Sequence, residues 1–369
     1  MIKVVTVIGA RPQFVKAAVL SREFIASGKV KEVIVHTGQH FDQNMSDIFF
    51  QEMEIPAPNY QLSINSLGHG AMTGRMLEQI ETILLNEKPD FVLVFGDTNS
   101  TLAAALAAKK LGIKIVHVEA GVRNFDENMP EEINRYLVDR MADINFCCTY
   151  LGVENLRREG FFEPEQHCKI FNFGDVMFDA TLFYRERSIA QKPNFREIDK
   201  INNPYILCTI HRASNTDDSF ILKEIVDGLN QINQHCRVIL PVHPRTKSKL
   251  NSLNVRVDFL CIDPVGYFDM IRLIENCKAI ITDSGGLVRE AYFFKKPSMY
   301  LLEKSPWPEL VEEMVCVSVA PIKEKIIGGF GLMQDFHFKN NNYLFGHGDA
   351  GQKIVAKIIS YYHEEFNTI

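Results

Sequence analysis

The sequence has 369 residues, of which 46% are hydrophobic and 23% are charged, and its net charge at pH 7 is −6. This length predicts about two domains, and the composition is typical of a folded protein. The negative charge argues against nucleic acid as a partner. The N-terminus reads as a strand without a signal peptide, and no apolar run reaches the roughly 18 residues of a membrane span. We therefore expect a cytoplasmic protein with no membrane partner.

The eight cysteines are scattered along the chain and never form a CxxC pair. Most of them lie in apolar runs, such as Cys208 in YILCTI. This pattern favours buried thiols in a reducing compartment. Cysteine and histidine also lack the spacing of zinc ligands, so we expect no metal site.

The N-terminal half alternates apolar runs with helical patterns. The first run, at 3–8, predicts a buried parallel strand and ends in GARPQ, followed by a helix that contains Lys16. Gly9 permits a tight turn there, and Arg11 is either a phosphate contact at a helix N-terminus or a surface ion pair. Further strands are predicted at 33–36 and 144–148. No GxGxxG motif follows a strand, which disfavours a nicotinamide cofactor.

The stretch at 91–135 concentrates acidic side chains at strand ends. The strand predicted at 91–95 ends in Gly-Asp-Thr, and the strand at 113–118 ends in Glu-Ala-Gly. A Pro-Glu-Glu string then begins another helix. Asp97, Glu119 and Glu131 should therefore approach one edge of a parallel sheet, where ligands of α/β proteins bind. Neighbouring carboxylates can act as acid or base, although each alone could cap a helix or form an ion pair.

The C-terminal half repeats this alternation, with strands predicted at 205–210, 237–241, 257–262, 279–282 and 298–302. The fourth strand ends in Asp-Ser-Gly-Gly and opens a helix, which predicts either a diphosphate site or a capped helix beside a tight turn. Glu290 in that helix could accept hydrogen bonds from ribose hydroxyls. His211 ends the first strand of this half and is either structural or a group that transfers protons or binds phosphate.

The predicted fold class is α/β with two doubly wound parallel-sheet domains. The first domain is predicted at 1–170, with the C-terminal helix at about 355–369 packing back on it. The second is predicted at 171–354, after a crossing segment at 171–175. A repeated pattern supports this division. Asp97 and Asp283 are each followed by a helix of similar length, then by a lysine pair and another strand.

Several strings occur in the order and spacing of one known family: GARPQFVK, TGQHFD, FGDTNST, HVEAGVR, MPEEINR, PVHPR and TDSGGLVRE. With them, the sequence resembles the non-hydrolysing UDP-N-acetylglucosamine 2-epimerases over nearly its whole length. The resemblance implies a GT-B fold with two Rossmann-like domains, a UDP-sugar substrate in the cleft between them, no cofactor, and a homodimer. It also implies a reaction, which inverts C2 of UDP-GlcNAc to give UDP-ManNAc by elimination and re-addition of UDP.

Site residues follow from the resemblance position by position. The catalytic positions are Asp97, Glu119, Glu131 and His211. The substrate-binding positions are Arg11, Lys16, Arg135, His243, Ser284, Gly285, Gly286 and Glu290. A second UDP-sugar activates some relatives, and the positions matching that site are Gln39, His40, Arg75, Glu132 and Arg212, with His243 beside them.

Three departures from the common family pattern concern the substrate and its regulation. Gln13 stands where these enzymes have Glu, Trp307 where they have Arg, and Asp42 where the activator site has Gln. Strings such as HGAMTGR and GDVMFDA resemble a branch acting on UDP-2,3-diacetamido-2,3-dideoxy-glucuronate, so both sugars stay open. A GT-B glycosyltransferase is the alternative from another class, and we expect Gln13, Trp307 and their neighbours to select the sugar.

Overall fold

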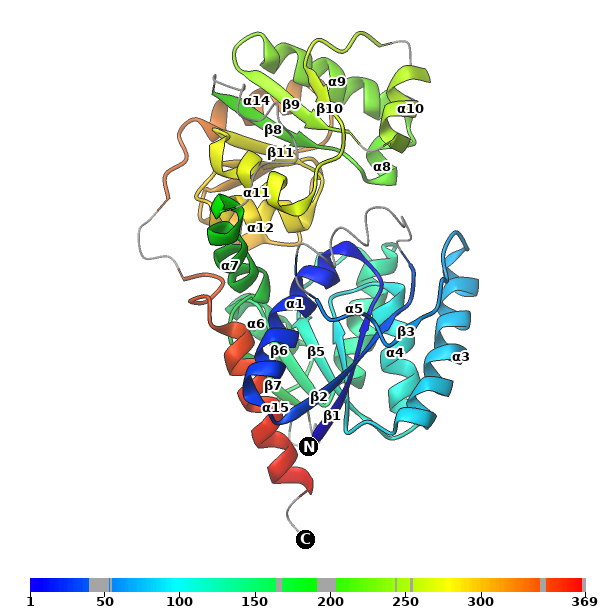
Figure 1. The fold of residues 1–369 in the computed structure, drawn as a ribbon. Helices are drawn as coiled ribbons and strands as arrows, with labels where there is room; N and C mark the ends of the chain where they lie inside the picture. Colours follow the sequence, from blue (N-terminus) through cyan, green and yellow to red (C-terminus); the bar gives the residue numbers. More distant parts are fainter. Residues whose placement is uncertain are drawn as a thin grey trace. The chain divides into compact units, whose positions relative to one another are not determined.

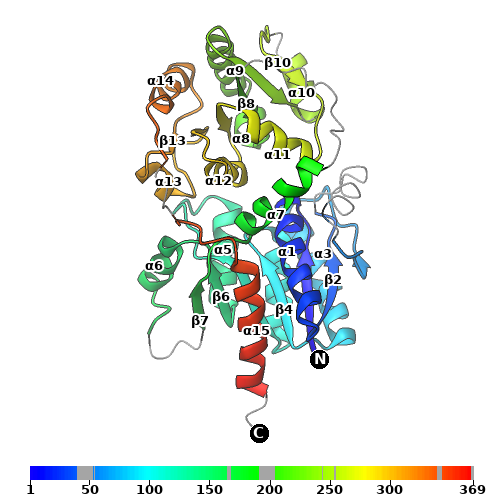
Figure 2. The ribbon, with the colours of Figure 1, turned by 60° about the vertical axis from the view of Figure 1, so that its left-hand side comes forward.

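The computed structural model describes residues 1–39, 53, 55–163, 168–190, 204–242, 244–252, 255–338 and 343–366. The chain forms two compact units, drawn in Figures 1 and 2. Unit 1 holds Met1–Leu182 and Tyr343–Ile369, and unit 2 holds Phe183–Asn342. Each unit is a parallel sheet covered by helices, so the α/β class is confirmed.

Unit 1 contains a seven-stranded parallel sheet in the order β3-β2-β1-β4-β5-β6-β7. Its strands are β1 (Ile2–Ile8), β2 (Val30–His36), β3 (Tyr60–Gln61), β4 (Phe91–Phe95), β5 (Lys114–Ala120), β6 (Ile144–Cys147) and β7 (Lys169–Asn172). Strands β1 to β3 follow one another toward one edge of the sheet, and strands β4 to β7 follow one another toward the other edge. The switch point lies between β1 and β4. Ligands of doubly wound proteins bind at the carboxyl ends of the strands beside such a switch point.

Helices cover both faces of this sheet, which explains why β4 is apolar and buried at every position. They are α1 (Arg11–Ser27), α3 (His69–Glu87), α4 (Asn99–Lys110), α5 (Pro130–Met141), α6 (Tyr150–Arg158) and α15 (Ala350–Phe366). Helix α7 (Val176–Ala190) begins in unit 1 and continues past the unit boundary at 182/183. The alanine-rich helix α4 is central on its face and contacts α3 and α5. Its small side chains permit this close packing, and Thr98 caps its first turn by accepting a hydrogen bond from Thr101 N.

Unit 2 contains a six-stranded parallel sheet in the order β10-β9-β8-β11-β12-β13. Its strands are β8 (Tyr205–Thr209), β9 (Arg237–Pro241), β10 (Leu260–Ile262), β11 (Ala279–Thr282), β12 (Ser298–Tyr300) and β13 (Cys316–Ser318). Its helices are α8 (Ala213–Thr216), α9 (Ser219–Asn233), α10 (Pro244–Ser252), α11 (Tyr267–Asn276), α12 (Gly285–Phe293), α13 (Pro308–Glu312) and α14 (Lys323–Met333).

The strands of the two sheets follow the same order along the chain, which confirms the predicted similarity between the two halves. Strand β4 in unit 1 and strand β11 in unit 2 are each the first strand beyond the switch point. Asp97 and Asp283 each follow one of these strands. The two acidic turns therefore occupy equivalent places in two similar sheets.

The unit boundaries lie at 182/183 and 342/343, whereas the sequence predicted 170/171 and 354/355. Phe171 pairs with Phe146 in the sheet as part of β7, so the expected crossing segment at 171–175 is partly a strand. The chain re-enters unit 1 at Tyr343, before the last helix begins. There Phe345 O accepts a hydrogen bond from Asp175 N at 2.9 Å. Helix α15 then packs beside α1 (Figure 2).

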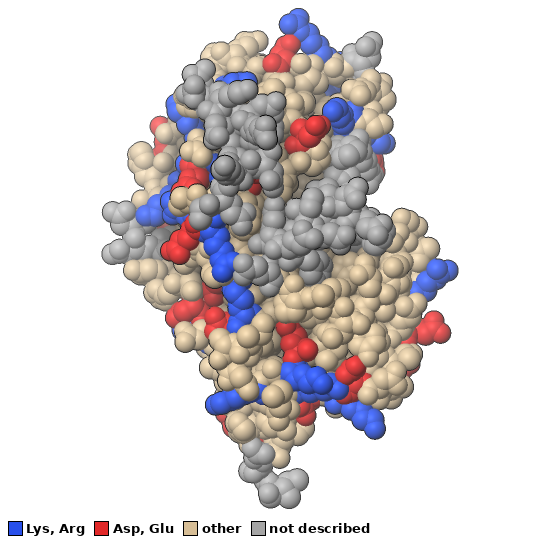
Figure 3. Space-filling view, in the orientation of Figure 1, with Lys and Arg blue, Asp and Glu red and all other residues tan. Residues whose placement is uncertain are grey.

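The exterior of the described chain is mixed in charge. On the face drawn in Figure 3, basic and acidic side chains are interspersed. Within the described ranges, no helix is long and apolar enough to span a bilayer.

Candidate active site

Asp97 lies at the carboxyl end of β4. The preceding Gly96 has a φ of 60°, a conformation that glycine adopts without a steric cost. Asp97 Oδ2 accepts a hydrogen bond from Arg135 at 2.5 Å, and Asp97 O accepts one from Asn134 Nδ2 at 2.8 Å. Its side chain remains 25% exposed. Helix α5 thus holds both the backbone and the carboxylate of Asp97 while leaving the carboxylate open to a ligand.

Glu119 lies in a β-bulge at the end of β5, where the pairing with β6 shifts between Val118 and Ala120. Its φ of 75° is in the left-handed region, which costs a residue with a side chain about 1 kcal/mol or more. The bulge places the carboxylate against Lys16, at 2.6 Å. A Cβ atom built on Gly96 would lie 3.6 Å from Glu119 Oε1, so the structure brings Glu119 beside the turn that carries Asp97.

Helix α5 begins with two acidic residues that have different environments. Glu131 is exposed in the first turn, one helical turn before Arg135 on the same face. Glu132 is fully buried, accepts a hydrogen bond from Phe125 N at 2.9 Å and pairs with Arg135 at 2.8 Å. Arg135 therefore bridges two carboxylates, a buried one on its own helix and the accessible one of Asp97.

Two further side chains join Glu119 at the strand ends. The ligand-type atoms of Glu119, Cys148 and Asp175 lie within 4.8 Å of one another, at the ends of three neighbouring strands. The Lys16 ammonium group, 2.6 Å from Glu119, supplies positive charge to this cluster from the protein itself. The arrangement is that of a buried ion pair at the edge of the sheet.

Gln13 joins the GARPQ loop to the turn of Asp97. Its Oε1 accepts hydrogen bonds from Gly9 N at 2.8 Å and Ala10 N at 3.0 Å, and its Nε2 donates to Phe95 O at 2.9 Å. Only 2% of Gln13 is exposed. It was predicted to help select the sugar, and this environment instead supports a role in holding two loops together. Its effect on the substrate stays a prediction.

His211 follows β8 in unit 2 and is oriented by Asp283. His211 Nδ1 lies 2.9 Å from Asp283 Oδ1, and the backbone N–H groups of His211 and Arg212 each donate to Asp283 Oδ2 at 2.9 Å. Burial of Asp283 raises its pKa, but the hydrogen bond and charge of His211 and these N–H groups outweigh burial, so the pKa lies below its ordinary value. The His211 side chain is 55% exposed, and this arrangement leaves its Nε2 available to a ligand.

The Asp-Ser-Gly-Gly turn opens helix α12, as the sequence predicted. Ser284 caps this helix by accepting a hydrogen bond from Leu287 N, and Gly285 follows as its first residue. The indole of Trp307 donates from Nε1 to Gly285 O at 3.1 Å. Further along α12, Glu290 accepts a hydrogen bond from Tyr267 OH at 3.1 Å. The helix N-terminus offers N–H groups of the kind that bind phosphate, with Glu290 about one and a half turns beyond.

Comparison with known proteins identifies this arrangement. A family model described as UDP-N-acetylglucosamine 2-epimerase matches residues 22–359. The UDP-2,3-diacetamido-2,3-dideoxy-D-glucuronate 2-epimerase of Pseudomonas aeruginosa is 46% identical over 354 residues, which cover 96% of this chain and 98% of that protein. The chain belongs to the UDP-N-acetylglucosamine 2-epimerase family.

Other members of the family support the same assignment. The UDP-N-acetylglucosamine 2-epimerase of Methanocaldococcus jannaschii is 40% identical over 97% of this chain and 99% of its own. The crystal structure of the M. jannaschii UDP-GlcNAc 2-epimerase in complex with UDP-GlcNAc and UDP matches with a TM-score of 0.89, covering 98% of this chain and 100% of that chain. The GT-B fold expected from the sequence is thereby confirmed. A glycosyltransferase from Rickettsia africae, 14% identical with a TM-score of 0.54, shares only the fold.

Some of the epimerase positions predicted from the sequence fall outside the described structure. His40, Asp42 and His243 lie outside the described residues, and Arg11 begins α1 with a side chain that is not described. Their assignments stay predictions.

The remaining positions assigned to the activator site are scattered over both units. Gln39 Oε1 accepts from Ser100 N at 3.0 Å, and Arg75 is exposed on α3. Glu132 is buried against Arg135, whereas Arg212 donates from Nε to Asp283 O at 2.8 Å. The contacts of Gln39, Glu132 and Arg212 hold turns of this protein in place, and binding of a second UDP-sugar stays a prediction.

Sequence reasoning missed several side chains at or beside the predicted site of this epimerase. Asp283, Tyr267 and Asn134 contact predicted site residues, whereas His117 and Asp139 contact the neighbouring turns at Gly96 and Gly121. Asp283 belongs to a motif that the sequence analysis quoted, and its equivalence to Asp97 was the signal that could have found it. Asn134 and His117 also lie within quoted motifs, MPEEINR and HVEAGVR, but their contacts leave no sign in those strings. Tyr267 and Asp139 lie outside the quoted motifs.

Proposed function

We propose that this epimerase inverts C2 of a UDP-linked 2-acetamido sugar without a cofactor. Family membership supports the reaction class. The observation that carries the proposal in the structure is the pair Asp97 and Glu119 at adjacent strand ends. Each pairs with a cation, and a Cβ atom at Gly96, the residue before Asp97, would lie 3.6 Å from Glu119 Oε1. Carboxylates in this position can both stabilise positive charge and accept a proton.

Two carboxylates suit the chemistry of this inversion. The C2 proton of a 2-acetamido sugar is not acidified by a neighbouring carbonyl group, so its direct removal would be very slow. When UDP departs with the electron pair of the C1–O bond, positive charge develops on the ring and eases loss of that proton. The electrons of the C2–H bond then form the C1=C2 bond of a 2-acetamidoglucal, and UDP returns to C1 as a proton is delivered to the opposite face of C2.

We assign removal of the C2 proton from one face to Asp97. Glu119 and Glu131 assist, Glu119 by stabilising charge on the ring and the exposed Glu131 as the acid that delivers a proton to the opposite face. Asp97 is accessible and paired with Arg135, so it is a carboxylate, the form that accepts a proton. Glu119 is 11% exposed and paired with Lys16, which suits a fixed electrostatic role better than repeated proton exchange.

We assign the departing diphosphate to the N-terminus of α12 and to His211. The amides of this helix N-terminus favour an anion, and the glycine residues let a ligand approach the backbone. The Asp283 carboxylate orients His211 through Nδ1. The other ring nitrogen, Nε2, can then donate a proton or a hydrogen bond to a phosphate oxygen. Glu290 would contact the ribose.

Two sugars are candidates for the substrate. UDP-GlcNAc is the first, because the family model and the M. jannaschii relative are described by it. UDP-2,3-diacetamido-2,3-dideoxy-D-glucuronate is the second, because the relative that acts on it is 46% identical to this chain, against 40% for the M. jannaschii protein. Both carry the acetamido group at C2 and the UDP leaving group that the mechanism needs.

The test is incubation of the purified protein with each UDP-sugar in deuterated water, followed by proton NMR. We expect exchange at C2 and appearance of the C2 epimer with the true substrate only. Release of free UDP and free sugar would indicate a hydrolysing epimerase. Conversion only after addition of an acceptor sugar would indicate a glycosyltransferase, and a UDP-sugar left intact in every case would indicate a binding protein. Each of these three outcomes contradicts the proposal.

We infer that the enzyme works in the cytoplasm as a homodimer. Exposed Ile133 and Leu137, one turn apart on α5, give unit 1 an apolar surface that a second copy could cover. Light scattering on the purified protein should give twice the chain mass of 42.1 kDa, and a mass of one chain would contradict the dimer.

A further inference from the structure

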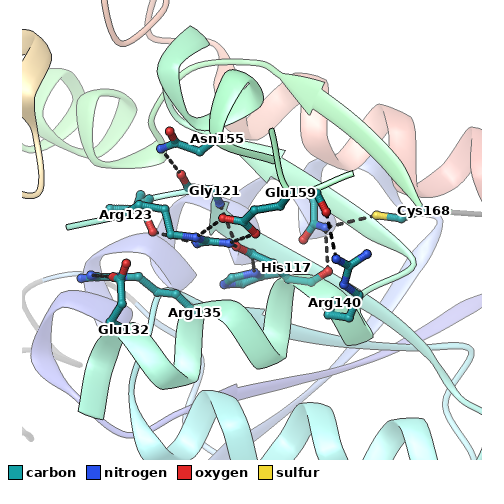
Figure 4. A network of polar contacts seen from close by, with 12 residues as sticks. His117, Gly121, Arg123, Glu132, Arg135, Arg140, Asn155, Glu159 and Cys168 are labelled. Carbon is teal, nitrogen blue, oxygen red and sulfur yellow. Dashed lines mark hydrogen bonds and ion pairs between the residues drawn. The ribbon is translucent and has the colours of Figure 1, made fainter. Parts of the chain in front are cut away.

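A buried histidine links the two strand ends that carry the proposed catalytic carboxylates. His117 lies on β5, two residues before Glu119, and is fully buried. Its Nε2 lies 2.8 Å from Gly96 O, and its Nδ1 lies 2.7 Å from Asp139 Oδ1. Figure 4 shows His117 within the polar network that includes Gly121 and Arg123. Gly96 immediately precedes Asp97 in the chain. The imidazole thus reaches from one catalytic strand to the turn of the other.

Asp139, on α5, extends this link to the far side of Glu119. It is fully buried, and its Oδ2 accepts from Gly121 N at 3.1 Å and pairs with Arg123 at 2.7 Å. Burial raises the pKa of Asp139, but the hydrogen bond of His117 and the charge of Arg123 outweigh burial and hold the pKa below its ordinary value. Asp139 therefore remains a carboxylate within the core of unit 1.

Both ring nitrogens of His117 face acceptors. A backbone carbonyl oxygen and a carboxylate both accept, so either ring nitrogen of His117 has an acceptor in place for its proton. Asp139 also forms a fully buried ion pair with Arg123, so an anion and a cation are removed from water here. Such a pair gives little net stability compared with apolar packing, because desolvation of the two charges offsets their attraction. Stability alone therefore does not explain why charged groups are placed here.

The contacts of His117 and Asp139 instead concentrate on the backbone around the site. Gly96 precedes Asp97, and Gly121 follows the bulge of Glu119 by two residues. The Gly121 turn is also held from outside, because Asn155 Nδ2 donates to Gly121 O at 2.9 Å. A side chain at Gly121 would place its Cβ atom 2.3 Å from Gly152 O. The backbone on both sides of Glu119 is thus tightly fixed.

We propose that His117 and Asp139 are positioning residues, which fix the relative placement of Asp97 and Glu119 for the chemical step. The inference rests on the proposed function, in which these two carboxylates act on the same sugar ring. Misplacement of a reacting group by about 1 Å can cost about 100-fold in rate. Loss of the His117–Gly96 hydrogen bond should therefore lower kcat, while KM and the affinity for UDP stay close to those of the unaltered protein.

The test separates the two hydrogen bonds of His117. In His117→Asn the side-chain amide nitrogen can take the place of Nδ1 and keep the bond to Asp139, but it cannot reach Gly96 O. In the double variant His117→Gln, Asp139→Asn, the glutamine Nε2 can reach Gly96 O. Its Oε1 can accept from the new asparagine amide, whose oxygen still faces Gly121 N. This double variant keeps these hydrogen bonds while it removes the charge of Asp139, and Arg123 retains its ion pair with Glu159.

The matched control is Asp143→Asn. Asp143 Oδ2 accepts from Ile115 N at 2.9 Å, at the amino end of the same strand β5 and away from the catalytic turns. We measure kcat, KM, UDP affinity by calorimetry, and the melting temperature for the unaltered protein and the three variants. The substrate is the UDP-sugar that the unaltered protein converts. If the unaltered protein inverts neither UDP-sugar, the proposed function itself fails, before any variant is compared.

We expect His117→Asn to lose about tenfold or more in kcat with KM and UDP affinity changed less than about twofold, and the control to keep its kcat. A kcat of His117→Asn within about twofold of the unaltered protein overturns the proposal. So does an equal loss in the control, or a change confined to KM. If His117→Asn does not fold, the test rests on the folded double variant. A loss of about tenfold or more in the kcat of that variant overturns the proposal, and a smaller loss supports it.

Discussion

The carboxyl group of Asp179 should make the stability of the protein depend on pH in an unusual direction. Asp179 lies on α7 and accepts a hydrogen bond from Gly351 N, in the first turn of α15, at 2.7 Å. Burial raises its pKa from 3.8 to about 6, despite the hydrogen bonds from Gly351 and Ala350. A carboxyl group with a raised pKa stabilises the fold only while it is protonated. Its contribution is full below pH 3.8 and is lost as the pH rises through about 6.

The size of the effect follows from the two pKa values. The folded protein releases the Asp179 proton at about pH 6 and the unfolded chain at about 3.8. Relative to a side chain that cannot ionise, the cost to the fold is therefore about 1.5 kcal/mol at pH 5 and about 3 kcal/mol at pH 7 and above. Asp179→Asn keeps an oxygen for Gly351 N and cannot ionise, so it should be more stable than the unaltered protein by up to these amounts.

Urea unfolding followed by circular dichroism, at pH 5, 6, 7 and 8 and constant ionic strength, measures this difference. The control is Thr181→Ala on the same helix, which removes the hydrogen bond from Thr181 Oγ1 to Met177 O but no titrating group. Its effect on the free energy of unfolding should be constant across the series. If the advantage of Asp179→Asn is equally constant, or shrinks as the pH rises, the reasoning is refuted.

Four further predictions concern single residues. Asp97→Asn should lower kcat by at least about 100-fold with little change in melting temperature, and near-normal turnover would remove Asp97 from its proposed role. Asp283→Asn should lower both kcat and the melting temperature, because it disturbs a buried carboxylate held by two backbone N–H groups and the Asn215 amide. His36→Leu removes a histidine whose pKa burial lowers to about 4, so the unaltered protein should lose about 3 kcal/mol relative to this variant between pH 7 and pH 4, in urea titrations extended to pH 4. Gly121→Ala should destabilise unit 1 by more than about 2 kcal/mol in calorimetry, since its φ is 75° and its Cβ atom would collide with Gly152 O.

Much of the fold was predictable because its signals are local. Continuous apolar runs identify buried parallel strands, and the acidic or glycine-rich turns that follow them identify the carboxyl edge of the sheet. Asp97 and Ser284 were placed correctly at strand ends for this reason. The repeat of the same unit in the second half predicted two similar sheets, which the shared strand order confirms.

The parts that were not predicted depend on contacts between distant segments. The bulge that gives Glu119 a positive φ leaves no mark in an apolar strand, because its cause is the pairing with β6. His117 looked like one more residue of that strand until Asp139 and Gly96 O were placed on either side of it. Gln13 was expected to help select the sugar, which stays a prediction. Its hydrogen bonds to Gly9, Ala10 and Phe95 were not predicted, because together they join the GARPQ loop to a segment that is distant in the sequence.

The two equivalent turns show how one architectural element supports two different roles. Asp97 in unit 1 and Asp283 in unit 2 each follow the first strand beyond the switch point, yet 25% of the Asp97 side chain is exposed and none of the Asp283 side chain is. Asp97 is held from outside by the guanidinium group of Arg135, which leaves its carboxylate on the surface of the turn. Asp283 points inward and collects N–H groups from the neighbouring turn, so the exposed group there is His211. A sheet edge of this kind can therefore present a base directly, or bury the acid and present the histidine that the acid orients.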